Sequence, residues 1–300
     1  MGGSLLAVFC GLGAAVCWTV SALCASSASQ AIGADSTLGW VMLIGLVIVI
    51  PPTAVLADPS QLTPSVLGLL AVAGATNVAG LLVEYVAFRR GKVGLVTAIA
   101  STEGMVAAVI SAVAGARLGL TTGLLLGLVT LGVAVSAASS GNDAPAREEG
   151  PADPAGPAVP RRRSVPWSLL AVSTALLFGV CLYTTGRAGQ QVSVLWALVP
   201  ARLFGSVLVA APLAARRRLR LTRRALPLVA AAGTAEVVGV LSYTIGARHD
   251  LAVAAVLSSQ FAALTAVAAY FIHGQRLSRG QLAGLAAVVT GVTLLAVFSP

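Results

Sequence analysis

The sequence is poor in charge. Asp, Glu, Lys and Arg together make up only 10% of its 300 residues, whereas a soluble globular domain contains about 25%. Hydrophobic residues make up 57%, and the mean hydropathy is +0.93. These values exclude a water-soluble domain, a disordered chain and a collagen-like repeat, and they predict a membrane protein.

Motifs for metal, nucleotide or covalent chemistry are missing from the sequence. Cys10, Cys17 and Cys24 are spaced seven apart in one apolar run and Cys181 lies in another, so no metal or disulfide spacing is present. There is no P-loop, no dinucleotide glycine fingerprint and no nucleophile motif. We therefore expect no cofactor and no metal, and we do not expect an enzyme.

Apolar runs long enough to cross a bilayer, which takes about 20 residues, fill most of the chain. They lack an alternation of period two, so helices are favoured over the strands of a barrel. Ten runs are delimited by polar residues, at 4–25, 37–57, 64–88, 93–114, 118–139, 166–186, 193–214, 225–246, 251–272 and 280–298. The predicted fold class is an all-α membrane protein with ten transmembrane helices.

The ten runs form two groups of five. The gap between the groups, at 141–165, is rich in Pro, Ala, Gly and charged residues and cannot bury enough apolar surface to fold alone. We predict that it is a linker between two five-helix units, residues 1–140 and residues 166–300.

The two halves contain similar residues at a nearly constant offset. Trp18 and Gly45 match Phe178 and Gly205, which lie 160 positions later, and a Tyr ends the third span of each half. Because five is an odd number, consecutive repeats enter the membrane from opposite sides. The prediction is therefore two inverted five-helix repeats, an arrangement typical of secondary transporters.

Several matched features resemble one family. They are an aromatic residue in the first span of each half, a Tyr ending the third span and a Gly-x-Arg-Leu hairpin before the last span: Trp18, Phe178, Tyr85, Tyr243, 115–118 and 274–277. Together they resemble the EamA-like branch of the drug/metabolite transporter superfamily, over the whole chain outside the linker. The Pro common in the family's fourth span and the Glu in the following hairpin are absent here, so no substrate is carried over.

The basic residues predict an orientation in the membrane. The formal net charge is +9, and fifteen of the 19 Lys and Arg residues lie in the loops that follow spans 1, 3, 5, 7 and 9. The positive-inside rule places these loops in the cytoplasm and both termini outside. The family resemblance favours cytoplasmic termini as the alternative. In either case the expected location is the inner or plasma membrane.

Four charged residues lie within the predicted spans, where a charge costs about 2.5 to 3.5 kcal/mol. Glu103 and Glu236 lie close to the midplane and are the strongest site candidates, with a role in helix packing as the alternative for each. Arg202 is either a substrate anchor or, preferably, a structural partner for an acid. Glu84 lies near the end of span 3 and is expected to pair with or snorkel towards nearby arginines.

Three uncharged polar residues complete the predicted site. Asn77 shares a helix face with Glu84, Tyr243 shares one with Glu236, and Gln260 follows two serines in span 9. They are expected to face a cavity or to form hydrogen bonds between helices.

These features together predict a secondary transporter that exports small metabolites or drugs by alternating access, with Glu103 or Glu236 coupling transport to protons. The alternative is a membrane protein that does not transport, such as a structural partner or a lipid-handling enzyme, and a channel is a third option. The expected partners are the lipid bilayer, a small-molecule substrate, protons and a second protomer. Nucleic acid is not expected, because the arginines lie in short gaps between spans.

Overall fold

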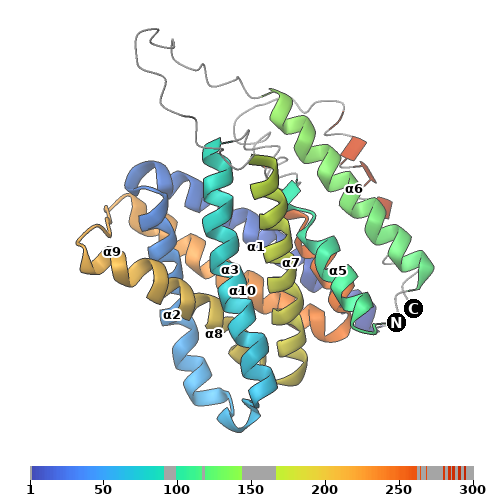
Figure 1. The fold of residues 1–300 in the computed structure, drawn as a ribbon, viewed down its shortest axis with the longest axis horizontal. Coiled ribbons are helices and arrows are strands. Elements are labelled where there is room, and N and C mark those ends of the chain that lie inside the picture. Colours follow the sequence, from blue (N-terminus) through green and yellow to red (C-terminus); the bar gives the residue numbers. More distant parts are fainter. Residues whose placement is uncertain are drawn as a thin grey trace, which may run out of the picture.

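The computed structural model describes residues 2–90, 99–116, 119–143 and 167–261, with scattered positions between 264 and 294. The described elements are all helical, and none of them is a strand (Figure 1). The α-helices are α1 (Gly2–Ile32), α2 (Ala34–Leu56), α3 (Pro64–Arg90), α5 (Glu103–Val113), α6 (Leu120–Asp143), α7 (Trp167–Gln191), α8 (Val194–Gly205), α9 (Ala211–Ala215), α10 (Ala225–His249) and α11 (Leu251–Ser258). A 3-10 turn, η1 (Pro59–Gln61), precedes α3, and a π-helical segment, η2 (Ser206–Ala210), joins α8 to α9.

Six described helical stretches are long and apolar enough to cross a membrane. They are Leu5–Ile32, Ala34–Leu56, Pro64–Glu84, Ser168–Gln191, Val194–Ala215 and Ala225–His249. This result confirms an all-helical protein with several membrane-spanning helices. The count of ten spans stays a prediction, because part of the ninth span, most of the tenth span and most of the linker lie outside the described residues.

The first span is longer than predicted. The sequence places its end at residue 25, where a run of serines begins, but α1 continues to Ile32. Ser27 donates its hydroxyl hydrogen to the carbonyl oxygen of Leu23, 3.0 Å away, so this polar side chain is satisfied within the helix. The chain then turns at Gly33, whose φ of 86° suits a glycine.

Two long helix pairs form the body of the molecule. α1 packs along α10, and α3 packs along α7; the second pair is visible side by side in Figure 1. Each pair joins a helix from the first half of the chain to one from the second half. The two halves are therefore interleaved and do not form separate bundles.

Reciprocal contacts relate the two pairs. A Cβ on Gly80 would lie 2.7 Å from Phe178 Cε1, and a Cβ on Gly239 would lie 2.6 Å from Trp18 Nε1. Trp18 and Phe178 are matched aromatic residues of the two halves, and the two glycines are 159 positions apart. Each aromatic ring thus packs on a glycine of the opposite half. This exchange supports the predicted repeat, which stays a prediction.

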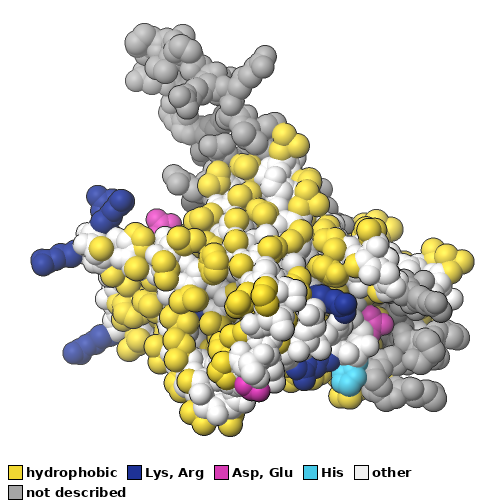
Figure 2. Space-filling model, turned by 60° about the horizontal axis from the view of Figure 1, so that its bottom comes forward, with side chains coloured by type: hydrophobic (Ala, Val, Ile, Leu, Met, Phe, Trp, Pro, Cys, Tyr) yellow, Lys and Arg dark blue, Asp and Glu magenta, His cyan; other side chains and the backbone are white. Residues whose placement is uncertain are grey.

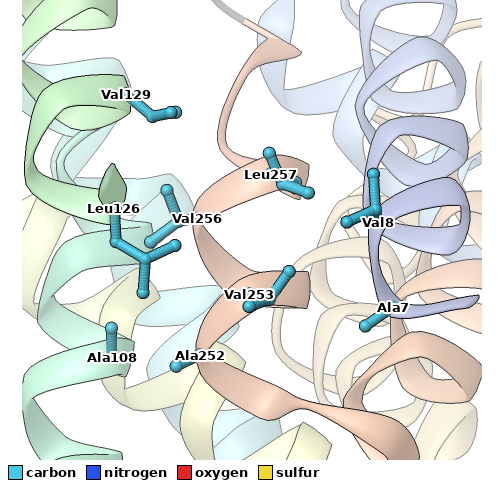
Figure 3. Close-up of a cluster of buried hydrophobic side chains, with 9 residues drawn as sticks. All are labelled: Ala7, Val8, Ala108, Leu126, Val129, Ala252, Val253, Val256 and Leu257. Carbon is cyan, nitrogen blue, oxygen red and sulfur yellow. The ribbon is translucent and has the colours of Figure 1, made fainter. Parts of the chain in front are cut away.

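The short helix α11 is the most deeply buried element. All of its residues are buried, and it packs between α1, α5 and α6. Figure 3 shows the apolar side chains of this cluster: Ala7, Val8, Ala108, Leu126, Val129, Ala252, Val253, Val256 and Leu257. Because α11 and the start of α5 are buried, polar groups at the end of α11 and at the start of α5 are held away from lipid.

Candidate functional site

Arg202 of α8 and Glu236 of α10 form an ion pair inside the bundle. Arg202 Nη2 lies 3.3 Å from Glu236 Oε1, and the two side chains are 1% and 22% exposed. Arg202 Nη1 also lies 3.5 Å from the sulfur of Met42 in α2. No other ion pair is present among the described residues. The pairing supports the interpretation of Arg202 as a structural partner for an acid.

Glycine makes the room for this arginine. A Cβ on Gly45 of α2 would lie 2.7 Å from Arg202 Cδ and 3.0 Å from Arg202 Nε. Contact as close as this leaves no space for a side chain unless the arginine moves. Gly45 therefore allows α2 and α8 to cross with the guanidinium enclosed between them.

The same crossing contains a matched contact from the other half. A Cβ on Gly205 of α8 would lie 2.5 Å from Met42 Cγ of α2. Met42 and Arg202 are 160 positions apart, as are Gly45 and Gly205. Each helix thus offers a glycine to a long side chain of the other, and only one of these two side chains is charged.

The helix after Arg202 changes its winding. Ser206 begins the π-helical segment η2, and such segments often lie at functional sites. Ser206 Oγ and Arg202 Nε are buried and have no hydrogen-bond partner in the described part of the chain. Buried polar groups without partners are uncommon, which marks this junction as specialised.

Glu103 lies at a break in its span. The sequence predicts a continuous fourth span over 93–114, but residues 101–102 form a turn and α5 begins at Glu103. The Thr102 hydroxyl donates to the carbonyl oxygen of Ile99, 2.7 Å away. Such local side-chain bonds compete with the helical pattern. Glu103 is buried.

The predicted ninth span is broken in the same way, because α11 ends at Ser258 and residues 259–260 form a turn. The two breaks touch: a Cβ on Gly104 would lie 2.5 Å from the Ala255 carbonyl oxygen and 2.6 Å from Ser259 Oγ. Interrupted helices that meet inside a bundle form the binding sites of many transporters.

The three intramembrane acids interact through their charges. Glu84 of α3 and Glu236 of α10 both act electrostatically on Glu103. The charge of Glu103 also acts on Cys181 of α7 and on Tyr243 of α10. The structure therefore brings three of the sequence-predicted residues, Glu84, Glu236 and Tyr243, into electrostatic range of Glu103. The side chains of Arg89 and Arg90, the expected partners of Glu84, lie outside the described set.

Tyr243 is fully buried and has structural contacts. Its hydroxyl donates to the carbonyl oxygen of Leu182, and its ring centroid lies 6.2 Å from that of Trp18. These contacts fix α10 against α7 and α1, so the side chain forms one wall of the acid cluster.

Two predicted amide side chains have an unused oxygen. The Oδ1 atom of Asn77 is buried without a hydrogen-bond partner in the described part of the chain. Gln260 donates through Nε2 to the carbonyl oxygen of Val256, 2.8 Å away, and its Oε1 is also without a partner. Trp18 Nε1 completes this group of buried, unpaired polar atoms among the described residues.

Sequence reasoning missed several members of the site. Cys181 has only a packing role in the sequence-based interpretation, and Met42 does not stand out from its apolar neighbours. Met42 lies 160 positions before Arg202, and Gly45 lies 160 positions before Gly205. This shared offset could have indicated that Met42 and Arg202 occupy matched positions where α2 crosses α8.

A pocket of about 410 Å³ lies elsewhere, at the ends of α7 and α10. It is lined by Gln61, Gln190, Gln191, Val192, Ser193 and Arg248. The Arg248 guanidinium donates to the carbonyl oxygens of Gly189 and Val192, and Gln190 donates to that of Ala247. Because these groups satisfy one another, we interpret the pocket as a joint between helix ends.

Comparisons with known proteins agree with this arrangement. Residues 5–138 match the EamA-like transporter family. A solved crystal structure of a protein is 18% identical in sequence and has a TM-score of 0.74, with 97% of this chain and 96% of that chain covered. At this identity the likeness shows the fold alone. No match was found among curated proteins.

Proposed function

We propose that the chain is a proton-coupled secondary transporter, starting from the match of residues 5–138 to the EamA-like transporter family, part of the drug/metabolite transporter superfamily. It exports small metabolites or drugs by alternating access. The observation that carries this proposal is the group of Glu84, Glu103 and Glu236, of which Glu103 is buried at the contact between two interrupted helices. Acids inside a membrane commonly belong to proton relays or substrate pathways.

We assign different roles to the two central acids. Glu236 is paired with Arg202, so its side chain is held in place and can orient a polar substrate. Glu103 has no ion pair with a described residue, and it lies at the contact between the two broken helices. It is therefore the residue that takes up and releases the coupling proton.

The unpaired polar atoms provide the substrate contacts in this proposal. Asn77 Oδ1 and Gln260 Oε1 accept hydrogen bonds, and Trp18 Nε1 donates one. A ligand with both donors and acceptors satisfies all three groups, which favours a small polar or amphipathic compound.

Alternating access follows from the reciprocal contacts. The helix pairs α1 with α10 and α3 with α7 each join the two halves of the chain. In alternating access, one such pair can tilt relative to the other while the contacts within each pair are kept. The predicted ten-span inverted repeat supplies an axis for this tilt. We propose that the termini lie outside and that the arginine-rich loops lie in the cytoplasm. A reporter that is active only in the cytoplasm, fused to the C-terminus, tests this, and activity there favours the alternative orientation.

A homodimer is a further part of the proposal. α6 packs chiefly on α5 and α11, and it exposes Leu120, Leu124 and Leu131. This face meets lipid or a second protomer. Cross-linking between cysteines introduced at Leu124 in a membrane preparation distinguishes the two.

The direct test of the function is a comparison of metabolites inside and outside cells that express the chain and cells that do not. We expect at least one small compound to be depleted inside and enriched outside the expressing cells. Identical profiles over a broad panel, with the protein present in the membrane, favour the non-transporting alternative.

A further inference from the structure

The loop at 216–224, between α9 and α10, contains six arginines in nine residues. All six are exposed: Arg216, Arg217, Arg218, Arg220, Arg223 and Arg224. The proposed transport cycle uses none of them. The positive-inside rule explains the net charge of this loop, but it does not explain the shape described next.

The backbone of the loop is tied to α2. The Ser36 hydroxyl accepts from the Arg220 N–H at 3.2 Å and donates to the Arg218 carbonyl oxygen at 3.4 Å. Trp40 Nε1 donates to the Arg220 carbonyl oxygen at 2.9 Å. The backbone that carries these arginines is therefore fixed relative to α2.

An apolar residue between the arginines anchors the loop. A Cβ on Gly39 of α2 would lie 3.0 Å from Leu219 Cδ1, so the leucine side chain fills the space that this glycine leaves. With Leu219 turned inwards, the neighbouring Arg218 and Arg220 side chains remain exposed.

The turn that starts the loop has an arginine in a backbone conformation that favours glycine. Arg217 has a φ of 53°, in the left-handed region where a helix usually ends with glycine. The Arg218 N–H donates to the Leu213 carbonyl oxygen at 2.8 Å, which closes the end of α9. A glycine would close this turn with less strain.

Arginines on the opposite face are used differently. Arg187 donates to Gln190 Oε1 at 3.0 Å, and Arg248 donates to the backbone at the end of α7. None of the six loop arginines forms an ion pair within the described part of the chain. Their charges are thus available to a partner outside the protein.

The loop lies where the membrane surface is expected. It follows the span Val194–Ala215 and precedes the span Ala225–His249. Apolar side chains of the adjoining helix, Leu203, Val207 and Leu208, are exposed. In Figure 2, dark blue side chains project from the end where Figure 1 shows α9, next to an apolar yellow surface.

We propose that this loop binds the phosphate headgroups of anionic lipids in the leaflet that it faces. A guanidinium holds two phosphate oxygens with parallel hydrogen bonds, and it does so best when its position is fixed in advance. Clusters of four to eight basic residues next to a membrane span are typical of anionic-lipid binding. The fixed loop therefore selects anionic lipid at one side of the transporter.

The test uses the full chain in nanodiscs that contain equal amounts of phosphatidylglycerol and phosphatidylcholine. The lipids that stay bound when the protein is released are counted by mass spectrometry. We expect wild type to retain phosphatidylglycerol in preference to phosphatidylcholine. In the triple variant Arg216→Gln, Arg218→Gln, Arg220→Gln, the ratio of the two retained lipids should fall about tenfold. Arg187→Gln, on the opposite face, is the control and should keep it.

A charge-preserving variant separates fixed geometry from net charge. Arg216→Lys, Arg218→Lys and Arg220→Lys together should retain part of the preference, because lysine keeps the charge but cannot hold phosphate with two parallel bonds. Equal retention of the two lipids by wild type overturns the proposal, and so does an unchanged preference in the glutamine variant. Binding of inorganic phosphate by the protein, found together with no preference for phosphatidylglycerol, shows a site for free phosphate and also overturns it.

Folding is checked independently for each variant. If the glutamine variant does not elute as a single species, the same measurement is made on wild type at high salt. Screening of exposed charges should then reduce the preference. A preference that persists unchanged at high salt contradicts binding through these arginines.

Discussion

Helices α2 and α8 meet at two contacts that have the same geometry and different chemistry. At one contact Gly45 of α2 receives Arg202 of α8, and at the other Gly205 of α8 receives Met42 of α2. Glycine is favoured at both, because a long buried side chain of the facing helix fills the space that a Cβ would take. The charge is present at one contact only, and there Glu236 neutralises it. The comparison teaches that the two halves share the glycine contact that packs α2 on α8, whereas only the second half places a charged side chain there.

The largest effect is expected when the charged contact loses its acid. Glu236→Gln leaves Arg202 buried without a counter-charge, which should lower the free energy of unfolding by about 3 to 5 kcal/mol. Thermal unfolding of the purified protein in detergent measures this loss. Met42→Leu, at the uncharged contact, is the matched control and should cost less than about 1.5 kcal/mol. Equal losses in the two variants would show that the ion pair has no special weight.

A smaller loss is expected from adding one carbon at either glycine. Gly45→Ala and Gly205→Ala should each destabilise the protein by about 1 to 3 kcal/mol, because the new Cβ overlaps a buried side chain. Gly68 serves as the control, since a Cβ added there would have no other atom within 4 Å. The same thermal measurement applies. If both alanine variants melt like the Gly68→Ala protein, the two helices are not in the close contact described.

Making the two contacts alike should have little effect on stability. Arg202→Met together with Glu236→Leu replaces the ion pair by apolar side chains, and methionine is the residue that the other half has at the position matched to Arg202. Replacing a whole buried pair by apolar side chains is often neutral, so unfolding should stay within about 1 kcal/mol of wild type. Transport of the identified compound should nevertheless fall, because the oriented carboxylate is lost. Full transport by this double variant would remove the substrate role of Glu236.

The smallest effect is expected far from the crossing, at Asp58 before η1. Hydrogen bonds from the Ser60 hydroxyl and the Ser60 N–H lower the pKa of Asp58 below its ordinary value of 3.8. A lowered pKa in the folded state contributes stability above pH 3.8, and this is lost as the pH falls through the folded value. Asp58→Asn should therefore melt slightly below wild type at about pH 7, with the difference vanishing at strongly acidic pH. A difference that grows on acidification would contradict these bonds.

Much of this architecture could be predicted from the sequence. Low charge and long apolar runs indicate a helical membrane protein, and the cost of charge in lipid singles out Glu103, Glu236 and Arg202. Their partners could not be predicted, because all three lie at similar depths and either acid could have met the arginine. Only the placement of α10 against α8 decides that Glu236 is the paired one.

The helix breaks beside Glu103 were also hidden from the sequence. Ser, Thr and Gln are tolerated inside a spanning helix, so hydropathy does not distinguish the turns at 101–102 and 259–260 from continuous helix. Tertiary contact makes the difference, since Gly104 brings the start of α5 directly onto the end of α11.

The central claim is that Glu103 couples transport to protons while Glu236 does not. The measurement is accumulation of the identified compound in liposomes that contain the purified chain, with and without a pH gradient. We expect wild type to accumulate the compound against its gradient only when protons flow. Glu103→Gln should still bind the compound and exchange it across the membrane, because size and hydrogen bonding are kept, but it should not accumulate it. Accumulation by Glu103→Gln with an unchanged dependence on the pH gradient would contradict the claim.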